Sequence, residues 1–73
     1  MDAQRLVAMA NDIARYFASE PDREAAIAGV TNHLEKFWDP RMRRQLRAYL
    51  EAGGEGLGDL ARAAVERLQI AQG

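Results

Sequence analysis

Apolar residues recur along the chain at the three- and four-residue spacing of α-helices, and no stretch alternates as a β-strand would. The spacing predicts helices at about residues 3–18, 22–37, 40–52 and 59–70. The segments between them are short and contain proline, acidic residues or glycine. We therefore expect a single all-α domain over residues 1–73, a small bundle of three to four helices with short loops and no strands.

Each predicted helix has an apolar stripe that should face the core. In the first helix the stripe is Leu6, Ala10, Ile13 and Phe17, widened by Met9, Ala14 and Tyr16, and in the second it is Ile27, Val30, Leu34 and Phe37. In the third helix it is Met42, Leu46, Tyr49 and Leu50, and in the last it is Leu60, Ala64 and Leu68. Gly29 interrupts the second helix, where glycine costs about 0.5–1 kcal/mol relative to alanine. The tolerated glycine indicates close packing against the first helix.

The boundary between the second and third predicted helices is marked by an Asp-Pro pair. Asp39 can accept N–H bonds from a new first turn, and Pro40 suits the first helical position, where its missing N–H needs no partner. Proline also disfavours the α conformation at Asp39, so the preceding helix should stop there. Phe37 and Met42 are then predicted as core residues on either side of this structural corner.

Two further boundaries are predicted from acidic residues and glycine. Asp2 and Asp59 are expected to begin the first and last helices as N-cap or first-turn acids, Asp59 as the N-cap itself. Residues 53–58 contain four glycines, which predicts unusual backbone angles or a hinge. Phosphate binding is not favoured there, because no strand precedes the glycines and no Lys–Ser/Thr pair follows them.

Length and composition limit what the chain can be. A chain of 73 residues forms one domain at most, and it buries only about 60% of its unfolded surface, so its isolated fold should be marginal. It has no cysteine, which rules out disulfides and thiolate metal sites and fits a cytoplasmic location. No segment resembles a membrane span or a secretory signal. We expect a cytoplasmic protein that gains stability from a partner.

Charge is unevenly distributed, although the formal net charge is only −1. Residues 36–47 contain Lys36 and four arginines against Asp39 alone. Arginine suits bidentate recognition of carboxylates. The near-zero total disfavours nucleic acid as a partner, and a small nucleic-acid-binding helical module is the less favoured alternative.

No set of residues predicts catalysis. His33 is the only histidine, and its nearest acids, Glu35 and Asp39, do not lie one helical turn away on the same face. We expect its ring to pack beside Phe37. The only serine, Ser19, lies in a turn, so no nucleophile–base–acid set is present. The chain is therefore predicted to be a non-enzyme without catalytic, cofactor-binding or metal-binding residues.

Trp38 and the arginines after it predict a partner interface. One interpretation of Trp38 is a core residue. Phe37 already occupies the inward position of the second helix, however, and the adjacent Trp38 is rotated by about 100° from it, so Trp38 would either cap the bundle end or project outward. Tryptophan and arginine are enriched at binding hot spots. The predicted interface residues are Trp38, Arg41, Arg43, Arg44 and His33. On this interpretation, replacing Trp38 and Arg41 by alanine would weaken association without loss of helicity.

The sequence also resembles a known family, the delta subunits of the soluble, NAD-dependent, molybdenum-containing formate dehydrogenases. The resemblance spans nearly the whole chain. It is carried by Met-Ala-Asn-Asp-Ile-Ala at 9–14, Asn-His-Leu at 32–34, Phe-Trp-Asp-Pro-Arg-Met-Arg at 37–43 and Gly-Gly-Glu-Gly-Leu at 53–57. The departures are small: Tyr-Phe at 16–17 where two phenylalanines are usual, and Gly-Asp at 58–59 where a proline is common.

The resemblance implies a non-catalytic accessory subunit of a cytoplasmic complex that oxidises formate to carbon dioxide and reduces NAD. It implies that the larger subunits carry a bis-molybdopterin guanine dinucleotide molybdenum cofactor, iron–sulfur clusters and FMN, and that this chain binds none of them. The implied partners are the catalytic alpha subunit and the other subunits of the complex, with no nucleic acid and no membrane. A transient assembly chaperone for cofactor insertion is the alternative.

Overall fold

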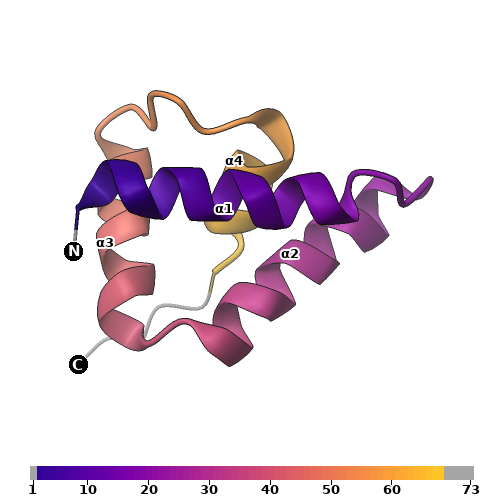
Figure 1. The fold of residues 1–73 in the computed structure, drawn as a ribbon, viewed down its shortest axis with the longest axis horizontal. Helices are drawn as coiled ribbons and strands as arrows, with labels where there is room; N and C mark the ends of the chain where they lie inside the picture. The colour runs from indigo at the N-terminus through magenta and orange to yellow at the C-terminus, as the bar shows by residue number, and fades with distance from the viewer. Residues whose placement is uncertain (1, 69–73) are drawn as a thin grey trace.

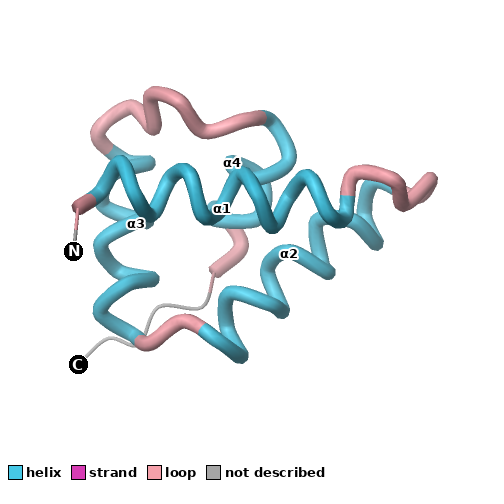
Figure 2. The backbone as a smooth tube through the Cα atoms, in the orientation of Figure 1, coloured by secondary structure: helices cyan, strands magenta, loops and turns pink. Residues whose placement is uncertain are grey.

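The computed structural model describes residues 2–68 and confirms the all-α fold (Figure 1). The helices are α1 (Ala3–Phe17), α2 (Arg23–Phe37), α3 (Pro40–Glu51) and α4 (Asp59–Glu66). Within the described residues every segment outside these helices is a loop or turn, and no strand is present (Figure 2).

Two helices hold the bundle together. Helix α1 crosses the molecule, α2 returns obliquely beside it, α3 stands near the start of α1, and α4 lies behind (Figure 1). Both α1 and α4 pack against all three other helices. Helices α2 and α3 are joined at a corner and otherwise meet mainly through α1 and α4.

Aspartate side chains begin three of the four helices. Asp2, Asp22 and Asp39 each have an extended backbone and accept a backbone N–H from the first turn that follows. This is the usual N-cap geometry, and it satisfies donors that have no partner inside the helix. At the third helix the Met42 N–H lies 2.9 Å from Asp39 Oδ1, and Pro40 occupies the first helical position.

The prediction that Asp59 is an N-cap is wrong by one position. The N-cap of α4 is Gly58, which has no side chain to offer, and Asp59 lies in the first turn. The reason is a tertiary contact, since the Gly58 N–H donates to Asn11 Oδ1 on α1 at 2.9 Å. The Gly58 carbonyl then accepts the first helical bond, from the Arg62 N–H at 2.8 Å.

The corner after α2 confirms the core interpretation of Trp38 and exposes Phe37 in its place. Trp38 is 6% exposed and belongs to the core, whereas Phe37 is 71% exposed, so the prediction of a core Phe37 is wrong. The helix ends at Phe37, and Trp38 adopts extended angles of φ −94° and ψ 141°. Because Trp38 has left helical geometry, the 100° rotation expected for a continuing helix does not apply, and its side chain turns inward. Met42 is half-buried against the core.

The core is built from small and medium apolar side chains of all four helices. Its fully buried large members are Leu6, Val30, Leu34, Leu46 and Val65. The buried set also contains Val7, which the predicted stripes omitted, and the loop residue Leu57. Tyr16, by contrast, is 78% exposed, so its assignment to the stripe of α1 is wrong. The position lies at the outer edge of the stripe, where the helix turns its side chain away from the core.

A buried hydroxyl links α2 to α4. Thr31 Oγ1 lies 2.9 Å from the Ile27 carbonyl and 3.1 Å from the Ala64 carbonyl, so its single hydrogen has an acceptor within its own helix and another across the contact. Burial of this hydroxyl is therefore not penalised by a missing partner.

The glycine-rich connection from α3 to α4 is a defined loop, not a hinge. Gly53 donates to the Leu50 carbonyl and Gly54 to the Tyr49 carbonyl, both at 3.0 Å. This pair of bonds is a Schellman motif, which ends a helix with a left-handed residue after it. Gly53 and Gly54 have φ values of 131° and 64°, which explains why glycine is required here.

Side chains from three helices hold the same loop. Asn11 on α1 donates from Nδ2 to the Gly56 carbonyl at 2.9 Å, in addition to accepting from Gly58. The Tyr49 hydroxyl donates to the Glu55 carbonyl at 2.7 Å. Arg62 on α4 donates to the carbonyls at positions 53 and 54, at 3.2 and 3.0 Å. Backbone polar groups of the loop are therefore hydrogen-bonded to side chains of the same protein.

Helix α4 ends before the predicted residue 70. Its last residue is Glu66, and the Arg67 and Leu68 N–H groups bond to the carbonyls of Ala64 and Val65, three residues earlier. Such bonds tighten the end of a helix. The Leu68 carbonyl is held by Arg47 of α3 at 3.1 Å, which draws the chain out of helical geometry. The rest of the predicted helix, residues 69–70, lies outside the described residues.

The burial of Trp38 predicts a large difference between neighbouring variants. Trp38→Ala should lower the free energy of unfolding by about 3–5 kcal/mol, because it leaves a cavity in the core. Phe37→Ala should change it by about 0.5 kcal/mol or less, because that side chain is exposed. Urea unfolding followed by circular dichroism measures both, and Trp38→Phe, with a smaller loss, keeps the comparison measurable if Trp38→Ala does not fold. A greater loss for Phe37→Ala than for Trp38→Phe would contradict the assignment.

The amide of Asn11 is predicted to stabilise the loop. Asn11→Ala removes two hydrogen bonds and should lower the free energy of unfolding by about 0.5–1.5 kcal/mol. It should also speed hydrogen exchange at the Gly58 N–H, measured by NMR. The neighbouring control is Asp12→Ala, which removes only an exposed ion pair and should be close to neutral. Equal effects of the two variants would show that the loop does not depend on Asn11.

Candidate protein-interaction surface

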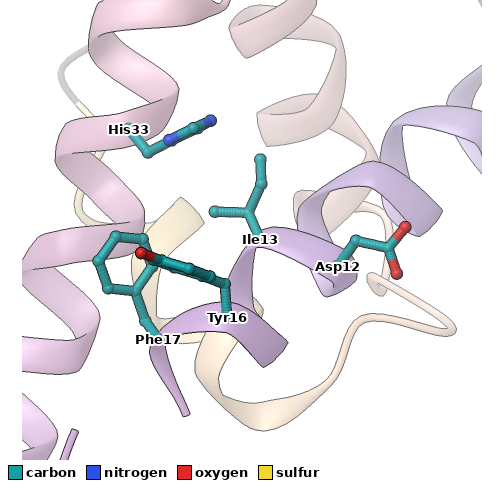
Figure 3. A pocket seen from close by; sticks show the side chains of 5 residues that line it. All are labelled: Asp12, Ile13, Tyr16, Phe17 and His33. Atoms are coloured by element: carbon teal, nitrogen blue, oxygen red, sulfur yellow. The ribbon is translucent and has the colours of Figure 1, made fainter. Parts of the chain in front are cut away.

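A strip of apolar and aromatic side chains lies open on the surface between α1 and α2. We call it the aromatic strip, and it consists of Ile13, Tyr16 and Phe17 on α1 with His33 and Phe37 on α2. Figure 3 shows four of them around a hollow, with Ile13 and His33 facing one another from the two helices. The hollow has a volume of about 460 Å³ and is lined by these four side chains and Asp12.

Two ring contacts make the strip continuous. The Tyr16 and Phe17 rings meet edge to face, with centroids 5.1 Å apart. The His33 and Phe37 rings are 4.7 Å apart at a tilt of 44°, which confirms the predicted packing of His33 beside Phe37. Pairs in this range are attractive, and they fix the orientation of side chains that are otherwise open to solvent.

Helical spacing and one glycine position the strip. Residues three and four apart share a helix face, which brings together the strip residues of α1 and places Phe37 one turn after His33. Gly29 lies where Phe17 meets α2, and a Cβ atom at Gly29 would come within 2.6 Å of the Phe17 ring. Gly29 therefore lets Phe17 lie flat against α2, which confirms the close packing predicted for this glycine.

The fold does not account for the exposure of the strip. Tyr16 and Phe37 are 78% and 71% exposed, and within residues 2–68 they are the two exposed large hydrophobic side chains. They lie at opposite ends of the same strip. Scattered apolar side chains on a surface are ordinary, but a contiguous apolar patch marks a surface that binds something.

The predicted interface residues divide into three groups. Trp38 is buried, so its side chain is not on the surface where an exposed interface was expected. Arg41 and Arg44 are exposed on α3, and His33 is part of the aromatic strip. Arg43 is half-buried, and its Nε atom has no hydrogen-bond partner among the described residues. The structure thus leaves Phe37 as the exposed aromatic residue of the corner.

Three cations near this corner make no ion pair with any other residue that the structure describes. The ion pairs within the described residues are Arg15–Asp12, Arg47–Glu51 and Arg67–Glu24. None involves Lys36, Arg41 or Arg44, which we call the basic corner. Arg47 contacts Glu51 and the Leu68 carbonyl instead.

One ion pair joins the start of α2 to the chain after α4. Arg67 donates from one nitrogen to both carboxylate oxygens of Glu24, at 2.9 and 2.7 Å. This hydrogen bond, with the charge attraction of Arg67, lowers the pKa of Glu24, and the same contact raises the pKa of Arg67. Both side chains are largely exposed, so water and salt weaken the attraction.

The described residues do not fit a resident metal or a membrane span. No three side chains of histidine, aspartate or glutamate converge among them, and the sequence has no cysteine. None of the helices within residues 2–68 has the combined length and apolar character needed to cross a bilayer.

The fold and this surface together define a small helical protein with an open apolar strip next to cations that have no ion pair within residues 2–68. The chain belongs to the family of NADH-dependent formate dehydrogenase delta subunits, FdsD, whose model matches residues 5–65. It is thus a member of a family of subunits of a formate dehydrogenase complex. No curated protein and no solved structure matches it.

Sequence reasoning missed two contributors to this surface and its support. Tyr16 was counted as core, although the stripe through Leu6, Ala10 and Phe17 was already wide enough to bury α1 without it. Asn11 was named only within the segment 9–14 that carries the family resemblance and was given no role of its own. Its side chain reaches a loop 45 residues away in sequence, so no local signal could identify its partner.

The lowered pKa of Glu24 predicts a pH dependence. Because the folded pKa lies below the unfolded value of about 4.3, the contact stabilises the fold above that pH. The stabilisation is lost as the pH falls through the lowered pKa. Glu24→Gln should therefore flatten this part of the stability profile, measured by urea unfolding from pH 7 to pH 3. The control Glu66→Gln removes an exposed carboxylate with no ion pair among the described residues, and it should keep the native profile. Identical profiles for both variants would contradict the prediction.

Proposed function

We propose that this protein is a non-catalytic accessory subunit that stabilises or assembles the formate dehydrogenase complex through contact with its alpha subunit. The observation that carries the proposal is the aromatic strip. Family membership implies partner subunits, and the strip is an exposed apolar surface of the kind that partners cover. A chain of this size has little core of its own, so covering the strip would also stabilise its fold.

The chemistry of the hollow supports binding in preference to catalysis. Its lining is mostly aromatic and aliphatic. Asp12, its one carboxylate, is engaged by Arg15 at 2.9 Å, and the His33 ring is packed on Phe37. General acid–base catalysis needs a positioned pair of titratable groups around a reacting atom, and these side chains offer a packing surface instead.

On this proposal the redox chemistry belongs to the other subunits. Formate oxidation and NAD reduction, with the molybdenum cofactor, iron–sulfur clusters and FMN, are carried by the larger chains in the cytoplasm. This chain raises the yield of assembled complex and lengthens its lifetime. Its removal should therefore change the amount of active enzyme more than the turnover of each assembled enzyme.

The test is to purify the mature enzyme from the native host through a tag on another subunit. We expect this chain in stoichiometric amount by quantitative mass spectrometry. Deleting its gene should lower the yield of assembled complex, while the rate per molybdenum in the remaining complex stays within about twofold. Finding the chain only on cofactor-free alpha subunit would favour the transient chaperone. Its absence from every form of the complex, or retention on nucleic acid with a steep salt dependence, would overturn the proposal.

A further inference from the structure

We infer that the aromatic strip binds an acidic amphipathic helix of the partner subunit. The apolar side chains of that helix fill the hollow between α1 and α2, and its carboxylates lie against the basic corner. This inference rests on the proposed function and adds to it the chemistry of the bound segment and the direction in which it lies.

The shape of the surface selects a helix. The hollow lies between two neighbouring helices, with a row of side chains at one-turn spacing on α1 facing His33 on α2. The described residues have no strand edge to which an extended peptide could add. A helix laid in the groove, read through apolar residues at i, i+3, i+4 and i+7, fits a surface formed between two helices.

The exposed rings provide the apolar part of the contact. Tyr16 and Phe37 stand at the two ends of the strip, while Ile13 and Phe17 are half-buried between the helices. In Figure 3 the ring of His33 and the side chain of Ile13 point into the same space from α2 and α1. A docked side chain would enter this space and be enclosed by rings on more than one side, which is the environment of a binding hot spot.

The charges at the ends of the strip indicate the sign of the charge on the bound segment of the partner. Lys36 follows His33 by three residues, so it lies one turn further along the same side of α2. Arg41 follows Phe37 by four residues, just after the corner, and Arg44 continues the exposed face of α3. None of the three has an ion pair among the described residues. Covering them without compensation would cost desolvation energy, which carboxylates on the partner would offset.

The opposite end of the strip carries charges of both signs. Beyond Tyr16 and Phe17 the turn contains Glu20 and Asp22, where Glu20 accepts the Asp22 N–H and Asp22 caps α2, and the exposed Arg23 follows directly. The cluster of Lys36, Arg41 and Arg44 therefore makes the Phe37 end the more basic of the two. The bound helix is inferred to place its most acidic turn at the basic corner.

The contact can be identified by photo-crosslinking in the assembled complex. The photoreactive residue p-benzoylphenylalanine replaces Phe37, which is exposed and not needed for the core. The complex is irradiated, and the attached peptide is sequenced by mass spectrometry. We expect one segment of the alpha subunit with apolar residues at helical spacing and an excess of aspartate and glutamate. A crosslink to a basic or non-helical segment, or to a second copy of this chain, would overturn the inference.

Charge reversal tests the electrostatic part with a matched control. Lys36→Glu with Arg41→Glu should weaken association with the purified alpha subunit by about tenfold or more at low salt, with a smaller difference at high salt. The matched single reversals are Lys36→Glu and Arg23→Glu, which change the charge by the same amount; Arg23 lies at the other end of α2, about 20 Å away, and Arg23→Glu should stay within about twofold of the native chain. Equal effects of the two changes would contradict a localised acidic contact.

Truncation tests the apolar part. Tyr16→Ala and Phe37→Ala should each weaken association by about tenfold or more, with little dependence on salt, whereas Phe37→Leu should retain most of the affinity. Circular dichroism must show native helicity for each variant. If the chain never associates with the complex, the proposed function fails as well. If it associates but the strip variants bind normally, only this inference fails.

Discussion

The structure depends on how the chain turns between α2 and α3. Helix α2 ends at Phe37, and the extended backbone of Trp38 places the largest side chain of the protein among the buried residues of the core. Asp39 and Pro40 then begin α3 at once, with the Asp39 carboxylate on the N–H of Met42. Two residues outside helical geometry, Trp38 and Asp39, therefore close the core and set the direction of the next helix.

The same turn creates the surface that we assign to binding. Because Trp38 fills the core position at the corner, Phe37 is left outside, where it packs on His33 and extends the aromatic strip toward the basic corner. At the other end, Gly29 allows Phe17 to lie against α2, which leaves Tyr16 beside it in solvent. At both ends of the strip, one residue packs in the fold and its neighbour in sequence is exposed for binding: Trp38 beside Phe37, and Phe17 beside Tyr16.

The candidate site could be predicted only in part. His33, Arg41 and Arg44 were predicted to be at an interface and are at or near the surface, while their role in binding stays a prediction. Trp38, the aromatic residue predicted at the interface, is buried and its neighbour Phe37 is exposed, because the backbone at Trp38 is extended and not helical. Tyr16 was predicted as a core residue, because helical periodicity identifies the apolar face of a helix but not how much of that face the other helices cover.

The sequence by itself determined the helices, the caps at Asp2 and Asp39, the Asp-Pro corner and the unusual backbone angles of the glycine-rich loop. These are local effects, in which a side chain or a backbone restriction acts within about four residues. Only the tertiary structure decided that Trp38 is buried, that Asn11 and Arg62 hold the loop, and that α4 has Gly58 as its N-cap and ends at Glu66. Each of these depends on a partner distant in sequence, so its outcome is set by how the helices pack and not by the pattern along the chain.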